Sequence, residues 1–347
     1  MFLLRKAFFS YPLRPVAIGA RGRVNQFFRT RPALVFYLLS LAIVCGVMAN
    51  GIIVMLTDAD AASAFTYLAG DIANAGGYIS IPWIARFAAT EPSLFGVFVF
   101  AAAPSVAAII AAAASGRLRR LGSMLLPWNG VSWTRAALVY AVILIGYGVG
   151  VAAFSWMTWR AGGDAALGEA FSALGVYAFG LGGLGLLLGL FLDEGGTLEE
   201  LGWRGFLQDI LSDKFAPLVT AITVGVLWWA WHLPREALTF MSGAPVEEVL
   251  WAQFVFLLLC VALSILIAAA WNQVGGSVWV GVLIHGGTNL WSKAFGEGAY
   301  VVFGGWMESV HPMLKVFDLR TTLVILLAAL VLVLLGPRLG RKAGSIG

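Results

Sequence analysis

Long apolar runs, each able to cross a bilayer, are the feature that most constrains how this chain folds. Eighteen or more apolar residues with almost no charge indicate a transmembrane helix. Such runs lie at about 33–56, 94–115, 136–157, 171–192, 217–235, 248–271 and 277–293, with a weaker one at about 321–336. Lipid requires every spanning backbone polar group to be paired inside the protein. The sequence therefore predicts an all-α fold, a polytopic transmembrane helical bundle with about eight spans.

The composition supports this class and makes charged side chains informative. Hydrophobic residues make up 60% of the 347 residues, and charged residues only 12%. The two cysteines, Cys45 and Cys260, each lie within a predicted span, where free apolar thiols are favoured over a disulfide. No cysteine-rich metal motif or extracellular disulfide framework is present. A charged group inside such a chain needs a specific physical reason.

The positive charges are distributed unevenly along the chain. Residues 1–32 contain seven Lys or Arg and no acid. If this arm is cytoplasmic and eight spans alternate, sixteen Lys or Arg, Arg204 among them, fall on the inner side and six on the outer side. This bias predicts that both termini are cytoplasmic. Anionic membrane lipids are the expected partner of the basic arm, and no nucleic acid is expected.

The predicted organisation is one membrane domain between two basic ends. Residues 1–32 form a basic cytoplasmic or interfacial arm, and 33–336 form a single transmembrane domain whose motif core is 170–293. Residues 337–347 form a basic cytoplasmic tail. Segment 57–93 is too broken to span and is expected along the outer interface. Segment 294–320 has no role that the sequence assigns.

The first polar cluster is the stretch LEELGWR, which holds Glu199, Glu200 and Arg204. Glu200 and Arg204 are four residues apart and share a helix face, which favours an ion pair. Glu199 is offset from Glu200 by about 100° and points elsewhere. The alternative is structural: Thr197 as N-cap with Glu200 at the third helical position would form a capping box.

Two further clusters lie inside apolar spans. The stretch WWAWHLP places His232 near the end of one span, and LIHGGTNLW places His285 and Asn289 four apart on one helical face. A single histidine near a membrane interface is most often a packing residue. Ionisable groups at membrane depth are costly, however, and two of three histidines inside spans indicate function.

Helix geometry predicts that these clusters meet. Residues 213–217 have the composition of a helix-to-helix turn, and Glu199 and His232 lie about sixteen residues on either side of it. At 1.5 Å per residue, equal arms of a helical hairpin bring the two side chains to the same level. This requires the fourth span to continue as a helix through Gly195 and Gly196. The polar residues then converge in a cavity formed by the central four helices, as in a hydrolytic site.

The three motifs, in this order, resemble those of the CPBP intramembrane proteases. This CAAX protease and bacteriocin-processing (Abi) family includes the Ras-converting-enzyme type of CAAX endopeptidase. The family pattern is Glu-Glu-x-x-x-Arg, an aromatic residue four before a His, and His-x-x-x-Asn. The resemblance covers about 170–293, and Trp228 stands where many members have Phe.

The resemblance implies an intramembrane endopeptidase that hydrolyses peptide bonds of membrane-anchored peptide or protein substrates. Glu199 would be the general base that activates water, and His232 would help to hold and polarise that water. His285 and Asn289 would stabilise the oxyanion, and Glu200 and Arg204 would orient the site. The Gly-rich, Trp-rich chain with this motif variant is typical of bacteria, which predicts a cytoplasmic (inner) membrane protein.

The family is often labelled metalloprotease, so the same function has two possible mechanisms, one without a metal and one with zinc. No cofactor is expected, because the helical HExxH motif is absent and the resemblance favours a metal-independent glutamate mechanism. The alternative is a zinc-dependent protease with Glu199, His232 and His285 as ligands.

Two other classes remain as alternatives. A membrane transporter also places Glu, Arg and His inside spans, although no inverted repeat is present. A catalytically inactive immunity or scaffold protein would keep the fold without the reaction.

Overall fold

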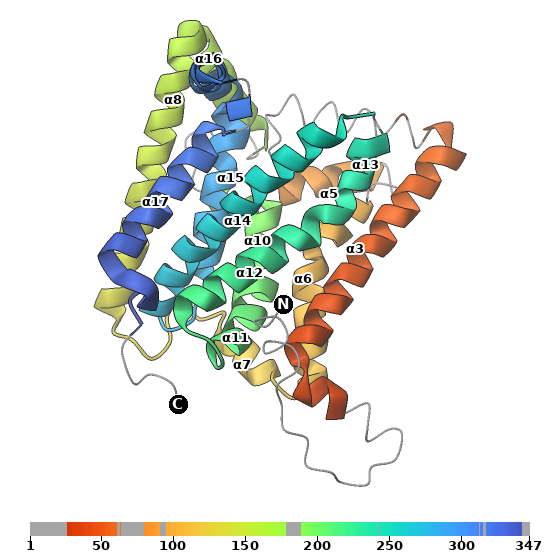
Figure 1. Cartoon of the computed structure of the whole chain (residues 1–347), viewed down its shortest axis with the longest axis vertical. Coiled ribbons are helices and arrows are strands. Elements are labelled where there is room, and N and C mark those ends of the chain that lie inside the picture. Colours follow the sequence, from red (N-terminus) through yellow and green to blue (C-terminus); the bar gives the residue numbers. More distant parts are fainter. Residues whose placement is uncertain are drawn as a thin grey trace.

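The computed structural model describes residues 26–60, 63, 80–90, 95–177, 189–241, 243–311, 313–314 and 317–341 (Figure 1). The described part of the chain is helical, with a single isolated bridge between Ser80 and Asp193, which confirms the all-α fold. Its α-helices are α3 (Pro32–Thr57), α5 (Ile81–Thr90), α6 (Phe95–Ser115), α7 (Leu118–Ser123), α8 (Trp133–Tyr177), α10 (Glu194–Glu200), α11 (Asp209–Ser212), α12 (Pro217–His232), α13 (Glu236–Met241), α14 (Val246–Gln273), α15 (Trp279–Ala299), α16 (Gly305–Val310) and α17 (Leu319–Leu335). Two π-helices, η2 (Leu201–Gln208) and η4 (Tyr300–Gly304), and two 3₁₀ turns, η3 (Leu233–Arg235) and η6 (Gly336–Arg338), connect them.

Five described helical segments are long and apolar enough to cross a membrane, and the chain is an integral membrane protein. They are Pro32–Thr57, Phe95–Ser115, Trp133–Ala170, Val246–Gln273 and Leu319–Arg338. The predicted spans at 217–235 and 277–293 correspond to α12, which has only 16 residues, and α15. Half of the predicted span 171–192 lies outside the described residues, as do the N-terminal arm up to residue 25 and the last six residues of the tail. Cys45 and Cys260 are both free thiols, as predicted.

The predicted helical turn at 213–217 is present. α11 ends at Ser212, and α12 begins at Pro217, which occupies the first helical position. Proline is favoured there because its missing N–H has no helical partner in any case. α11, η2 and α10 therefore form one arm of a hairpin, and α12 forms the other.

α10 lies in the middle of the bundle, packed against α6 and α15, while α12 packs against α14 (Figure 1). The hydrophobic core beside α10 is rich in aromatic side chains. The fully buried Trp203 ring lies edge-on to Phe36 at 5.5 Å and to Trp231 at 5.8 Å between centroids. This arrangement encloses η2 and keeps water away from the polar residues on α10.

α10 and α15 approach each other closely at a pair of glycines. A Cβ atom at Gly196 would lie 2.8 Å from the backbone nitrogen of Gly286, closer than real side chains come. Small residues at such a crossing let two membrane helices touch through their backbones. Side chains at the end of α10 can therefore reach partners on α15.

An ion pair joins α7 to α11 at the end of the bundle where both lie (Figure 1). Arg120 donates to both carboxylate oxygens of Asp209, at 2.6 and 2.7 Å. This bidentate hydrogen bonding raises the pKa of the Arg120 guanidinium, so the guanidinium stays charged. Arg341 also donates to the carbonyl of Ser212 at 3.0 Å, which ties the end of the chain after α17 to the same surface.

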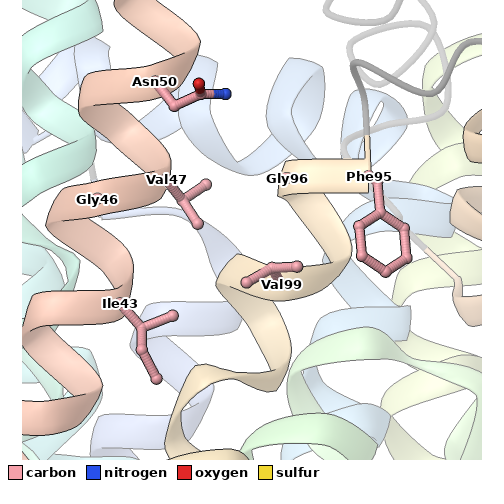
Figure 2. A pocket seen from close by; sticks show the side chains of 7 residues that line it. All are labelled: Ile43, Gly46, Val47, Asn50, Phe95, Gly96 and Val99. Atoms are coloured by element: carbon pink, nitrogen blue, oxygen red, sulfur yellow. The ribbon is translucent and has the colours of Figure 1, made fainter.

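A cavity of about 490 Å³ lies between α3 and α6, apart from the predicted site residues. Figure 2 shows side chains of both helices pointing into it. Its lining is apolar except for one amide: Ile43, Gly46, Val47, Asn50, Phe95, Gly96 and Val99.

Candidate active site

The two adjacent glutamates on α10 are both buried and face different partners. Glu200 is inaccessible and accepts hydrogen bonds at both oxygens, from Nε of Arg204 at 2.8 Å and from Nδ1 of His285 at 3.0 Å. Since an ionised carboxylate only accepts, Nδ1 of His285 carries the hydrogen. The predicted ion pair between Glu200 and Arg204 is confirmed.

Arg204 lies on the π-helix η2 and is completely buried. The count of Arg204 among the inner-side charges is therefore wrong, because this cation lies in the protein core. Its Nη1 donates to Oγ of Ser264 on α14 at 3.1 Å, and its guanidinium lies 5.4 Å from the ring centroid of Trp228. A buried ion pair contributes little net stability once its desolvation is counted. Its presence on a π-helix, an element frequent at functional sites, indicates a role beyond folding.

Glu199 points away from Glu200, as its helical offset predicts. Its Oε2 atom accepts two indole hydrogen bonds, from Nε1 of Trp203 at 3.2 Å and from Nε1 of Trp228 at 2.8 Å. Trp203 is four residues after Glu199, just as Arg204 is four after Glu200. Both glutamates therefore use the same helical spacing, one to bind an indole and the other a guanidinium.

His232 ends α12 and lies among aromatic rings. Its Nδ1 atom is 2.9 Å from the carbonyl oxygen of Trp228, so Nδ1 carries the hydrogen. The rings of Trp231 and Phe256 lie edge-on to the imidazole, at 4.7 and 5.0 Å between centroids. Trp228 connects His232 to Glu199, since it binds the imidazole through its carbonyl and the carboxylate through its indole.

His285 and Asn289 face α10 from α15, one helical turn apart. Nδ2 of Asn289 donates to Oδ2 of Asp193 at 2.9 Å, and the backbone N–H of Gly196 donates to the same oxygen at 2.7 Å. Asp193 is fully buried and was not among the predicted site residues. It fixes the start of α10 and the Asn289 amide with one carboxylate.

The position of Asp193 shows that two predictions about α10 are wrong. The N-cap is Asp193, so the capping box with Thr197 as N-cap is wrong, and Glu200 is the last α-helical residue. The helix expected to continue through Gly195 and Gly196 is interrupted before them, because the Asp193 backbone is extended, with ψ of 129°. An aspartate before a helix is a known cap signal, which could have identified this residue.

Gly195 lies directly beneath the two α15 side chains. A Cβ atom there would be 2.9 Å from Nε2 of His285 and 3.2 Å from Nδ2 of Asn289. Both distances are too short for a side chain to fit without moving these groups. The glycine therefore leaves room for the imidazole and the amide to lie against α10.

Five of the six predicted residues are buried and joined through hydrogen bonds and Trp228, and the half-buried Asn289 is joined to the start of α10 through Asp193. Glu199, Glu200 and Arg204 come from α10 and η2, His232 from α12, and His285 and Asn289 from α15. Within the described residues, no group of three or more His, Cys, Asp or Glu side chains is placed to hold a metal ion. Carboxylate and imidazole groups in such a network can take up, hold and donate protons, and the amide of Asn289 can donate hydrogen bonds.

The family comparison falls on this same region. Residues 181–291 match the sequence model of the family described as type II CAAX prenyl endopeptidase Rce1-like. The curated CAAX prenyl protease 2 of Methanococcus maripaludis is 29% identical over 98 residues, which cover 27% of this chain and 35% of the relative. The chain thus matches about a third of the length of that relative. Residues 181–291, which contain all six predicted site residues, thus resemble the Rce1-like type II CAAX prenyl endopeptidases, a family of peptidases.

Proposed function

We propose that the chain is an intramembrane endopeptidase whose active site is the buried network on α10, α12 and α15. The observation that carries the proposal is that three separate polar motifs lie in contact inside an apolar bundle, within the family match at 181–291. Charged groups at this depth are costly unless they serve a reaction or a pathway. A peptidase needs a base and hydrogen-bond donors that are shielded from bulk water, and the buried network supplies candidates for both.

Glu199 acts as the general base. It takes a proton from a water molecule as the water oxygen attacks the carbonyl carbon of the scissile bond. It then gives that proton to the leaving amide nitrogen when the carbon–nitrogen bond breaks. His232, whose Nδ1 is held by the Trp228 carbonyl, turns Nε2 towards the water as an acceptor and positions it.

His285 and Asn289 stabilise the oxyanion that forms on the carbonyl oxygen. Nδ1 of His285 donates to Glu200, so in the doubly protonated ring Nε2 is the second donor, and the Glu200 carboxylate balances the ring's charge. Arg204 holds Glu200 from the opposite side. Donors fixed before the reaction stabilise developing charge with little reorganisation, the largest contribution in many hydrolases.

The proposed substrates are membrane-anchored peptides or proteins, with prenylated CAAX tails as the first class to test. The curated relative's name describes a prenyl protease, and the site lies among membrane spans. We infer about eight spans, the five apolar helices together with α12, α15 and the segment at 171–192. Basic residues near α7 and α11 favour a cytoplasmic location for that end, with both termini inside, in a bacterial cytoplasmic membrane.

We expect the wild-type protein to cleave a CAAX probe after reconstitution. The probe is a fluorogenic peptide ending in a CAAX sequence with a farnesylated cysteine, in vesicles of phosphatidylethanolamine and phosphatidylglycerol. Its unprenylated copy is the comparator, and mass spectrometry locates the cut. Cleavage of the farnesylated probe alone assigns the prenyl class, and cleavage of both assigns a broader membrane-peptide class. Proton flux into the vesicles without any cleavage would favour the transporter instead.

Metal removal tests the alternative in which the protease depends on zinc. If Glu199 activates water without a metal, we expect treatment with 1,10-phenanthroline or EDTA to change kcat by less than about twofold. The measurement is probe cleavage before and after chelation, with a zinc peptidase treated in parallel to prove that chelation worked. Activity that disappears and returns only with added Zn²⁺ would assign Glu199, His232 and His285 as ligands.

A further inference from the structure

The three tryptophans of the stretch WWAWH differ in what their indole N–H groups meet. Trp228 donates to Oε2 of Glu199 at 2.8 Å, and Trp229 donates to Oε1 of Gln253 at 3.1 Å. Among the described residues, Nε1 of Trp231 has no hydrogen-bond partner, although that side chain is fully buried. The same core thus tolerates an unpaired indole N–H. Packing alone did not force Trp228 to find an acceptor.

Trp228 contacts most of the proposed site through different parts of one residue. Its carbonyl accepts from His232, and its ring lies 4.8 Å from the His285 ring, edge to face. The Arg204 guanidinium lies over the same ring at 5.4 Å. A shift of this indole therefore moves the surroundings of the base, both histidines and the supporting arginine together.

The two indole hydrogen bonds to Glu199 reach only one of its carboxylate oxygens. Among the described residues, the bonds from Trp203 and Trp228 both end on Oε2, and Glu199 is only 5% exposed. Two donors on one oxygen fix the rotation of the carboxylate plane. The second oxygen, Oε1, is left free of these two indole donors.

We propose that Trp228, with Trp203, is a positioning residue that fixes Oε2 of Glu199 so that Oε1 meets the attacking water. This rests on the proposed peptidase function, in which Glu199 is the base. The indole N–H bonds stabilise the ionised carboxylate, which is the form able to take a proton. They also hold Oε1 in a single orientation, and a misplaced base loses much of its rate advantage.

The test compares Trp228→Phe with Trp231→Phe. Both replace a buried indole of the same stretch by a phenyl ring, so the loss of volume is matched, but only the first removes a donor from Glu199. For Trp228→Phe we expect kcat to fall about 10- to 100-fold, as for the loss of one hydrogen bond to a charged group. KM changes little, and the acidic limb of the pH–rate profile moves to higher pH. For Trp231→Phe we expect kcat within about threefold of wild type and an unmoved acidic limb.

Equal losses of kcat in the two variants, with unchanged pH profiles, would overturn the proposal, because a packing role affects both alike. A second measurement does not depend on activity. Indole ¹⁵N–¹H NMR spectra of the full chain in nanodiscs are recorded, with peaks assigned by the Phe variants. Glu199→Gln should move the Trp203 and Trp228 peaks and leave the Trp231 peak. If the wild-type protein cleaves no probe, the peptidase proposal fails. The NMR comparison still tests the contact between the indoles and Glu199, because unmoved Trp203 and Trp228 peaks in Glu199→Gln would contradict it.

Discussion

We expect Glu199→Gln to lower kcat for the CAAX probe by about a thousandfold while the protein stays folded. A positioned general base contributes about 10²- to 10⁴-fold, and an amide cannot take the proton from water. Folding is retained because both indole bonds to Glu199 end on a single oxygen. The amide oxygen of glutamine can accept both. The measurements are single-turnover cleavage in proteoliposomes and the thermal unfolding midpoint in detergent.

The matched control is Glu247→Gln, the same substitution at an exposed glutamate in the first turn of α14. It should cleave at the wild-type rate. Two results would contradict the assignment of Glu199 as the base. The first is a variant that retains activity within about threefold, well below the effect of a general base. The second is a variant that unfolds, which would make Glu199 a structural residue.

Gly195→Ala should lower kcat by about a hundredfold, although the substitution adds only one methyl group and removes none of the proposed catalytic side chains. The new Cβ would lie 2.9 Å from Nε2 of His285, so the imidazole must move. Glu200 holds the other side of that ring, and a displacement of about 1 Å in an active site can cost 10²-fold. Cleavage of the same probe measures the effect, with KM expected to change much less than kcat.

Gly148→Ala is the control for this substitution, because a Cβ atom there meets open space on α8. Replacing a helical glycine by alanine is neutral or stabilising when the backbone permits it. We expect full activity and an unchanged or higher unfolding midpoint for Gly148→Ala. If Gly195→Ala cleaves as fast as Gly148→Ala, then His285 does not need its present position against α10.

The sequence predicted the helices and the meeting of the motifs, because both follow from local rules. Apolar run length identifies spans, and the four-residue spacing of Glu200 and Arg204 places them on one face. The turn at 213–217 followed from its composition. The hairpin argument, however, set His232 opposite Glu199, whereas the residue that bonds Glu199 is Trp228, one turn closer to the hairpin turn. The π-helix η2 explains this, since its wider turns hold more residues and shorten that arm.

The partners of the site residues were harder to predict, because they come from distant segments. The break at Asp193 is tied to contacts with Ser80 and Asn289, neither of which is near it in sequence. Ser264, which binds Arg204, has no local signal at all. Trp203 could have been found from its spacing after Glu199. Helical periodicity predicts which side chains share a helix face, but it does not predict which residues of the neighbouring helix they contact.

The buried charges also bear on how the chain enters the membrane during synthesis. Glu200 and Arg204 satisfy each other within one segment, but their other partners, Ser264 and His285, lie on α14 and α15. The ribosome synthesises these partners later, 60 residues after Arg204 for Ser264 and 85 residues after Glu200 for His285. Until they arrive, the hairpin that begins at α10 cannot be fully sheltered from lipid, so its final insertion depends on helices that are not yet made. The burial of Glu200 and Arg204 is thus complete only when the later helices α14 and α15 have packed against them.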